Sequence, residues 1–178
     1  GCGAEFEMRT SGAEISCGKC GAKRIMTEYG RMVRPDGSED GFSHIPDWYE
    51  WERECVKKEI DCGAYELNIR VKIESLPNAV NFIDLGEGRL VHNESGFKLI
   101  FKDYGDTEEK TLSFAPLTMT SVHTEYDYRG KGQCLTLSTL DNTYFIYPLE
   151  KGFHATKIQF ATEYLYEKCK AGLVVSKL

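Results

Sequence analysis

The stretch Arg89-Leu90-Val91-His92-Asn93-Glu94-Ser95-Gly96-Phe97-Lys98-Leu99-Ile100-Phe101 holds two short apolar runs on either side of a turn. Residues 89–92 and 97–101 predict two strands, and Glu94-Ser95-Gly96 is typical of the tight turn between them. Strands joined so closely pair as an antiparallel hairpin. The stretch therefore indicates a β-rich domain built from hairpins.

The same pattern continues on both sides of this hairpin. Further strands are predicted at residues 67–73, 111–114, 121–126, 134–137 and 144–147. Residues 154–170 then predict a helix with one apolar stripe, made of Ile158, Ala161, Leu165 and Cys169 with Tyr164 beside it. Gly172 is expected to end it. We expect a mainly β fold with two helices (α+β), in which residues 64–178 form a seven-stranded sandwich or barrel capped by this helix.

The other helix is predicted from Pro46 to Gly63. Proline and acidic residues occupy its first turn, lysines follow, and a glycine ends it. Its apolar face is made of Trp48, Trp51 or Cys55, Val56 and Ile60. A packing face is favoured here over an aromatic binding site. We expect residues 41–63 to connect two parts of the chain.

The segment Cys17-Gly18-Lys19-Cys20-Gly21 has the spacing of a zinc knuckle, in which two thiolates bind one tetrahedral ion. Upstream, Cys2-Gly3 resembles the end of a second knuckle. Residues 5–9 and 13–16 predict the hairpin between the two, with a turn at 10–12. We therefore expect Cys2, Cys17 and Cys20 to be metal ligands in a zinc ribbon within residues 1–40, followed by a linker at 30–45.

A tetrahedral site needs a fourth ligand, and a second knuckle would place it three positions before Cys2. We expect the chain to be cut inside the site. Either zinc is then lost through this truncation, or the site is completed by water, by a histidine or by another chain. The alternative is that these are three ordinary thiols at a frayed terminus.

The composition of the chain disfavours some classes of partner and of cellular location. The 178 residues carry a formal net charge of -6, which disfavours nucleic acid as a partner. No stretch resembles a signal peptide or reaches the roughly 20 apolar residues of a membrane span. Seven cysteines cannot all pair with one another, so reduced thiols and a cytoplasmic location are expected.

Catalytic signatures are not found in the sequence. It contains no Gly-x-Ser-x-Gly, no Walker-type loop and no His-Glu-x-x-His. His44, His92, His123 and His154 are scattered, and each is interpreted as a surface or capping residue. Arg129-Gly130-Lys131-Gly132 is a basic loop that is interpreted as a solvated turn, with phosphate binding as the alternative. No catalytic residue is therefore assigned.

Seven strands followed by one amphipathic helix resemble the pleckstrin-homology or GRAM-like fold, and residues 88–99 resemble one of its hairpins. This is a likeness of topology. Such folds often bind head groups between their early strands, so the resemblance implies weak contact with a membrane surface through Arg129 and Lys131. A lipid head-group binder is accordingly one hypothesis.

Four strings carry a second resemblance: Cys17-Gly18-Lys19-Cys20-Gly21-Ala22-Lys23, Phe42-Ser43-His44-Ile45-Pro46-Asp47-Trp48-Tyr49-Glu50-Trp51-Glu52-Arg53, Ser75-Leu76-Pro77-Asn78 and Phe160-Ala161-Thr162-Glu163. Together they resemble the C-terminal extension of some bacterial acyltransferases of the 1-acylglycerol-3-phosphate type. That family uses a His-x-x-x-x-Asp motif. The nearest segment here, His123-Thr124-Glu125-Tyr126-Asp127, is one residue short.

The resemblance implies that the catalytic domain lies upstream of this chain. The chain would then be a non-catalytic accessory or regulatory region for phospholipid synthesis, with the acyltransferase domain as its partner and membrane association through the parent protein. The alternative is an independent zinc-ribbon adaptor that binds a protein. That reading depends on the Cys17–Cys20 knuckle and the aromatic helix.

Overall fold

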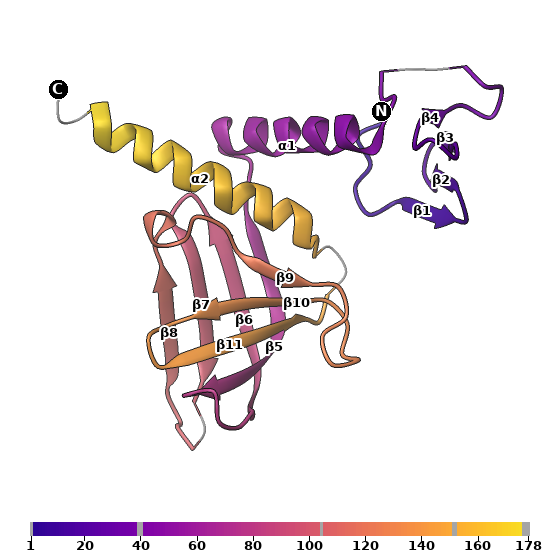
Figure 1. Cartoon of the computed structure of the whole chain (residues 1–178). Coiled ribbons are helices and arrows are strands. Elements are labelled where there is room, and N and C mark those ends of the chain that lie inside the picture. Colours follow the sequence, from indigo (N-terminus) through magenta and orange to yellow (C-terminus); the bar gives the residue numbers. More distant parts are fainter. Residues whose placement is uncertain (1, 39–40, 104, 151–152, 176–178) are drawn as a thin grey trace. The chain divides into compact units, whose positions relative to one another are not determined.

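The computed structural model describes residues 2–38, 41–103, 105–150 and 153–175. Gly1, and Glu39 and Asp40 of the predicted linker, lie outside these ranges. The chain divides into two compact units, residues 1–55 and 56–178. Each unit is built on an antiparallel sheet of its own (Figure 1). The boundary falls inside helix α1 (Ile45–Asp61).

The first unit contains a four-stranded sheet in chain order: β1 (Met8–Ser11), β2 (Glu14–Cys17), β3 (Lys23–Met26) and β4 (Met32–Val33). The predicted hairpin is confirmed as β1 and β2, although β1 begins at Met8 rather than at residue 5. The strands β3 and β4 were not predicted from the sequence.

The prediction of a linker at residues 30–45 is wrong for part of that segment. It contains β4 and a bridge between Arg31 and His44. Met32 is almost fully buried, and its N–H donates to the Ser43 carbonyl at 2.7 Å. Glycines and charged residues flank this strand on both sides. Because the strand has only two residues, the sequence shows no period there.

Helix α1 has a cap at each end. The Asp47 carboxylate accepts the N–H of His44 at 3.0 Å and the hydroxyl of Ser43 at 2.9 Å. At the other end Gly63 has a φ of +71° and donates its N–H to the Ile60 carbonyl, which confirms the predicted glycine stop.

The packing interpretation of the apolar face of α1 is confirmed for most of its residues. Within the first unit, Trp48 stacks on Phe42, and Trp51 meets the edge of the same ring while remaining 41% exposed. Val56 and Ile60 are buried in the second unit.

The second unit holds a seven-stranded antiparallel sheet and a C-terminal helix. Its elements are β5 (Leu67–Pro77), β6 (Ile83–Asn93), β7 (Gly96–Lys102), β8 (Glu109–Phe114), the short 3-10 helix η1 (Pro116–Thr118), β9 (His123–Glu125), β10 (Cys134–Ser138), β11 (Asn142–Pro148) and α2 (Ala155–Val175). All seven predicted strands are confirmed, and β6 is much longer than predicted. The strand order is β8-β7-β6-β5-β11-β10-β9, and all pairings are antiparallel.

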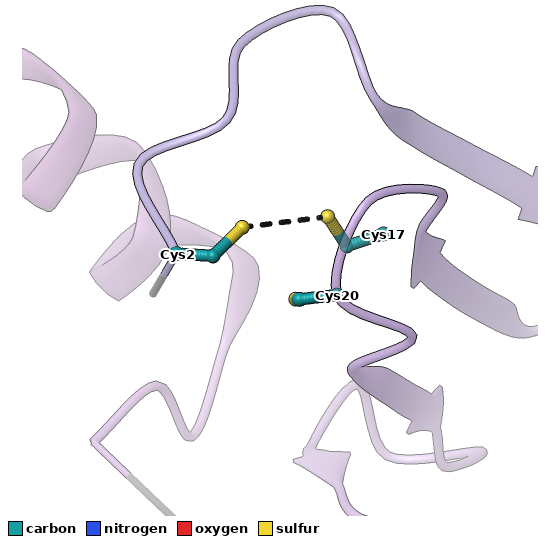
Figure 2. Close-up of side chains that lie close together, drawn as sticks. All are labelled: Cys2, Cys17 and Cys20. Carbon is teal, nitrogen blue, oxygen red and sulfur yellow. Dashed lines mark hydrogen bonds between the residues drawn. The ribbon is translucent and has the colours of Figure 1, made fainter.

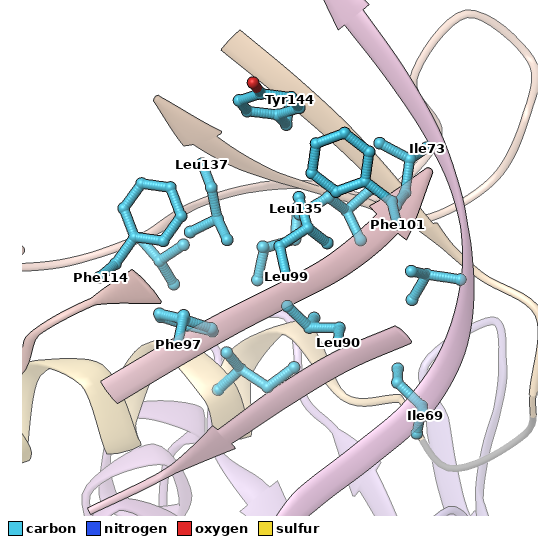
Figure 3. Close-up of a cluster of buried hydrophobic side chains, with 14 of the residues drawn as sticks. Ile69, Ile73, Leu90, Phe97, Leu99, Phe101, Phe114, Leu135, Leu137 and Tyr144 are labelled. Carbon is cyan, nitrogen blue, oxygen red and sulfur yellow. The ribbon is translucent and has the colours of Figure 1, made fainter. Parts of the chain in front are cut away.

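The sheet is curved but open. Its terminal strands β8 and β9 do not pair with each other in the described part of the chain, so the closed-barrel alternative is wrong. Side chains from both halves of the sheet nevertheless share one core (Figure 3). Its fully buried members include Val71, Ile73, Leu90, Leu99, Leu135, Leu137 and Ile146. Burying each such side chain contributes roughly 1.5–3 kcal/mol.

Strand β5 shows how the sequence produces this core. Ile69, Val71 and Ile73 alternate inward, as period 2 requires. The register with β6 shifts between Ile73 and Glu74, which marks an irregularity of the β-bulge kind. The curved strands approach closely at Gly88, where an added Cβ would lie 2.5 Å from the Ile100 carbonyl oxygen. Only glycine fits there.

Helix α2 contributes Ile158 to this core, and its residues Phe160, Ala161 and Leu165 are also buried, which confirms most of the predicted stripe. The predicted stop at Gly172 is wrong, because the helix continues to Val175. A glycine inside a helix costs only about 1 kcal/mol relative to alanine, so it weakens a helix without ending it. The second half of α1 is tied to α2 by Asp61, which accepts from the Tyr164 hydroxyl and pairs with Lys168.

Candidate metal centre

Cys2, Cys17 and Cys20 converge at one point of the first unit (Figure 2). Cys17 ends β2, Cys20 lies in the turn that follows, and Cys2 precedes β1. The three sulfur atoms lie within 4.8 Å of one another, and those of Cys2 and Cys17 are 3.8 Å apart. Four sulfurs at about 2.3 Å from a tetrahedral zinc ion are themselves about 3.8 Å apart. The chain thus holds three thiols at a spacing that one metal ion requires.

Backbone hydrogen bonds shape the knuckle before any metal is considered. The Gly21 N–H donates to the Cys17 carbonyl at 2.9 Å, and the Cys17 N–H donates to the Ala22 carbonyl. Gly21 has a φ of +70°, a conformation that glycine adopts without strain. Gly3, which follows Cys2, has nearly the same φ of +68°. The glycines that follow Cys2 and Cys20 therefore share a positive φ.

The electrostatics of the turn favour a thiolate at Cys17. Backbone N–H groups of Cys20 and Lys19 donate toward its sulfur and lower the Cys17 pKa to about 7. At Cys20 a donor from Ala22 acts in the same direction. There, the hydrogen bonds with the thiols of Cys2 and Cys17 outweigh it and raise the Cys20 pKa. One of the three thiols is thus half ionised near neutral pH, and a cation would favour ionisation of the other two.

No other cysteine and no histidine of the described residues joins this cluster. Among the described residues, Cys2, Cys17 and Cys20 form the one group of metal-capable side chains that converge. Cys62 is exposed, whereas Cys55 is half-buried. Burial raises the pKa of the Cys134 thiol to about 11, which suits a structural residue.

The interpretation of His92 as a surface or capping residue is wrong. It is 1% exposed, stacks on Phe97 with ring centroids 3.8 Å apart, and hydrogen-bonds the Tyr65 hydroxyl through Nδ1 at 2.9 Å. The signal was present in the sequence, since His92 occupies an inward position of a predicted strand. His44, His123 and His154 are exposed.

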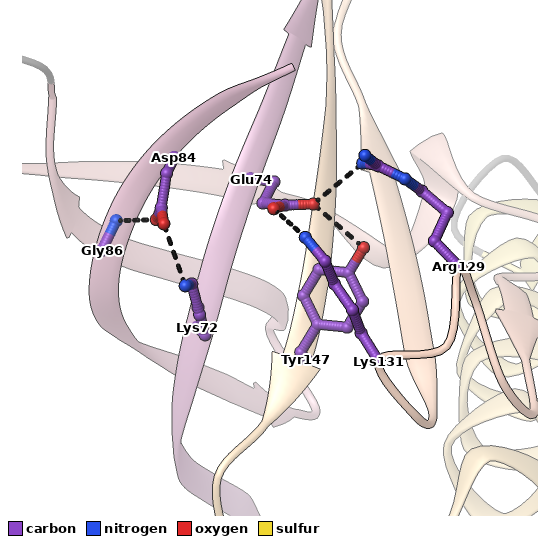
Figure 4. Close-up of polar contacts among 7 residues, drawn as sticks. All are labelled: Lys72, Glu74, Asp84, Gly86, Arg129, Lys131 and Tyr147. Carbon is purple, nitrogen blue, oxygen red and sulfur yellow. Dashed lines mark hydrogen bonds and ion pairs between the residues drawn. The ribbon is translucent and has the colours of Figure 1, made fainter.

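The basic loop at residues 129–132 is not a freely solvated turn. The cations of Arg129 and Lys131 both reach the carboxylate of Glu74, which also accepts the Tyr147 hydroxyl at 3.1 Å (Figure 4). Glu74 is 6% exposed, and the Arg129 guanidinium also lies 4.0 Å from the Phe82 ring centroid. The loop is thus held over the outer face of the sheet by a buried carboxylate.

Glu74 and Tyr147, which lie on the neighbouring strands β5 and β11, were not predicted as site residues from the sequence. The available signal was weak, because Glu74 stands on the solvent side of an alternating strand, where an acidic residue is ordinary. What buries it is a loop more than fifty residues away in sequence. Head-group binding by Arg129 and Lys131 stays a prediction, and any such ligand would have to compete with Glu74.

Comparisons with known proteins identify no relative of this chain. No family model matches the chain, and no curated protein or solved structure matches it significantly. Among the described residues, none of the helices has the length and apolar character needed to cross a membrane. What can be concluded of function therefore depends on the residues themselves.

Proposed function

We propose that Cys2, Cys17 and Cys20 bind one zinc ion, and that this ion holds the first unit in its folded form. The observation that carries the proposal is the convergence of three sulfur atoms within 4.8 Å of one another. Thiolates are soft ligands, and zinc is the metal that such sites most often hold for structural purposes. A zinc ribbon made of β1–β4 fits this arrangement, with a fourth donor beyond these three cysteines.

A structural role is supported by how little apolar surface the first unit buries. Among its described residues the buried hydrophobic side chains are Cys17 and Met32. Ordering one residue costs roughly 1–2 kcal/mol of backbone entropy, and two buried side chains cannot offset that over fifty residues. Units this small usually depend on a metal or on disulfides. Metal binding would supply the missing folding free energy.

We further propose that the chain is a non-catalytic binding protein, and that the metal-bound unit presents its surface to a protein partner. Support comes from the large apolar side chains that this unit leaves exposed: Phe6, Met8, Ile25, Met26, Tyr29, Ile45 and Trp51. Aromatic residues and methionines are the side chains that protein interfaces use most often. Attachment to an upstream acyltransferase domain and a pleckstrin-like fold for the second unit stay predictions, and the adaptor reading is the better supported of the two.

The metal proposal is tested by competition with a chromophoric zinc chelator, using the wild-type chain and single Cys→Ser variants. We expect about one zinc ion per chain and a large loss of affinity in Cys17→Ser and Cys20→Ser, since each removes a ligand. The matched control is Cys62→Ser, whose thiol is exposed and outside the cluster. Cobalt substitution adds an independent readout, because tetrahedral thiolate coordination gives a characteristic visible spectrum. Equal zinc affinity in Cys17→Ser and the wild type would refute the proposal.

A further inference from the structure

Two of the three clustered thiols, those of Cys2 and Cys17, are close enough to form a covalent bond after a small movement. Their sulfur atoms are 3.8 Å apart and point toward each other (Figure 2). The sulfur atoms of a disulfide are about 2.05 Å apart, so this pair would have to close by about 1.8 Å. The pair is therefore a candidate site for oxidation to a disulfide.

The segment that carries Cys2 can supply this movement. Residues 2–7 precede β1 and belong to no helix or strand. The end of the segment is held beside the knuckle, because the Gly18 N–H donates to the Glu7 carbonyl at 2.7 Å. Cys17 is less free to move, since its own N–H and its carbonyl both form backbone hydrogen bonds within the knuckle. Closure thus requires a shift of Cys2 toward a sulfur that is already fixed.

Exposure gives the two thiols different roles in such an oxidation. Cys2 is exposed, whereas Cys17 is only 7% exposed. A small oxidant in solution therefore reaches the Cys2 sulfur first. The buried sulfur beside it is then in position to attack the oxidised one. Cysteines that sense oxidants commonly combine these two features, an accessible sulfur and a second thiol next to it.

We propose that Cys2 and Cys17 form a reversible disulfide on reaction with hydrogen peroxide, and that this modification releases the metal ion from the first unit. The proposal rests on the zinc site proposed above. The disulfide uses two of the three thiolate ligands, so Cys20 is the one that remains. A structural zinc site needs four ligands, and the loss of two together removes most of its affinity. Metal binding by the first unit would thereby respond to peroxide.

The oxidation occurs in two steps. As a metal ligand the Cys2 sulfur is a thiolate, and it attacks one oxygen of hydrogen peroxide. An S–O bond forms, the O–O bond breaks, and hydroxide leaves a sulfenic acid on Cys2. The Cys17 sulfur then attacks the Cys2 sulfur, an S–S bond forms, the S–O bond breaks, and a second hydroxide leaves. Each hydroxide takes one proton from solvent. The two thiolates lose two electrons, and the peroxide gains them and becomes two water molecules.

The test begins with the zinc-loaded full-length chain and one equivalent of hydrogen peroxide. A chromophoric chelator that is too weak to remove zinc from the untreated chain reports any release. We expect about one zinc ion to be released per chain. The mass of the denatured chain should fall by about 2 Da, which is the loss of two hydrogen atoms. Dithiothreitol should restore both the mass and the capacity to bind zinc.

Tryptic peptides identify the pair that has reacted. Trypsin cleaves after Arg9 and Lys19, which separates the three cysteines. The peptides that carry them, one cysteine each, are residues 1–9, 10–19 and 20–23. After alkylation of the remaining thiols, we expect a disulfide between the first two peptides and an alkylated Cys20 on the third.

The matched variants are Cys2→Ser and Cys62→Ser, each of which removes one exposed thiol. Their readout is the peptide link, because Cys2→Ser also removes a metal ligand. Only Cys2→Ser should abolish the link between residues 1–9 and 10–19. In Cys62→Ser both the link and the release of zinc should match the wild type, since this thiol lies outside the cluster.

Three results would overturn the proposal: a link between residues 10–19 and 20–23, a sulfinic acid in place of the disulfide, or full retention of zinc after peroxide. The zinc site itself is judged before peroxide is added. An untreated chain that binds no zinc would refute the proposed function and this inference with it. A chain that binds zinc and keeps it after peroxide would refute this inference alone.

Discussion

The two units of this chain have sheets of similar topology and very different interiors. Both sheets are antiparallel and are built largely from strands that follow one another in sequence. Yet the buried hydrophobic residues lie almost entirely in the second unit, while Cys17 and Met32 are those described in the first. A strand pattern alone therefore does not say what stabilises a sheet. In one unit apolar burial stabilises the sheet, and in the other we propose that a metal ion does so.

Removal of the metal should have the largest effect among the predicted changes. It should unfold the first unit and leave the second unit folded. Both tryptophans, Trp48 and Trp51, lie in the first unit and contact Phe42, so their fluorescence reports chiefly on that unit. A strong chelator should unfold the first unit, because zinc contributes on the order of 10 kcal/mol to such small folds. The far-UV circular dichroism melt of the second unit should not change. A tryptophan signal that chelator leaves intact would contradict the comparison.

Substitution in the core should have the reverse effect. Leu135 is fully buried in the second unit, and Leu135→Ala should lower its free energy of unfolding by about 3 kcal/mol, through lost contacts and a cavity. Zinc affinity and tryptophan fluorescence should stay at wild-type values. Leu140→Ala is the control, because that side chain is fully exposed. Loss of zinc binding in Leu135→Ala would show that the units depend on each other.

Acid should weaken the second unit through His92. Burial lowers its pKa to about 3, so the folded protein keeps it neutral where the unfolded chain would protonate it. Between pH 6.5 and 5 the unfolded state binds more protons, and this residue alone should reduce stability by about 2 kcal/mol. Denaturant melts as a function of pH measure the loss. The His92→Phe variant, which keeps the stacking on Phe97, should show a flatter pH dependence; an unchanged slope would exclude His92 as the cause.

The smallest expected effect is that of the buried carboxylate on the outer face. Glu74→Gln keeps the shape but removes the charge that holds Arg129 and Lys131, whose side chains are each more than a third exposed. We expect a loss of about 1–2 kcal/mol in the second unit, since solvent can take over part of both cations. Asp84→Asn is the matched control. It breaks an exposed pair with Lys72 and should cost under about 0.5 kcal/mol.

The part of the fold that the sequence predicted well is the part with a clear period. Alternation in β5 and the stripe of Ile158, Ala161 and Leu165 in α2 identified their elements, because burial imposes those periods. Strand β3 was missed because its residues are mostly exposed, and β4, in which Met32 is buried, was missed because two residues are too few to show a period. The end of α2 was predicted too early because Gly172 was interpreted as a stop signal.

The candidate functional residues also include some that were predicted from the sequence and some that were not. The three cysteines were identified because their spacing reflects local geometry, and Gly21 marks the turn. The contact of Glu74 with Arg129 joins segments far apart in sequence. It leaves no local pattern, because each partner is an ordinary polar residue in its own segment. Only the tertiary fold brings them together.

The position of β5 in the strand order also has a consequence for synthesis. One neighbour of β5, β6, follows it directly, but the other is β11, the last strand of the chain. On a ribosome that adds about 5–20 residues per second, β5 must wait roughly 3–13 s for that partner to be made. During this interval the edge that will receive β11 is open to other chains, so a chaperone present during synthesis should matter more for this unit than its final stability suggests.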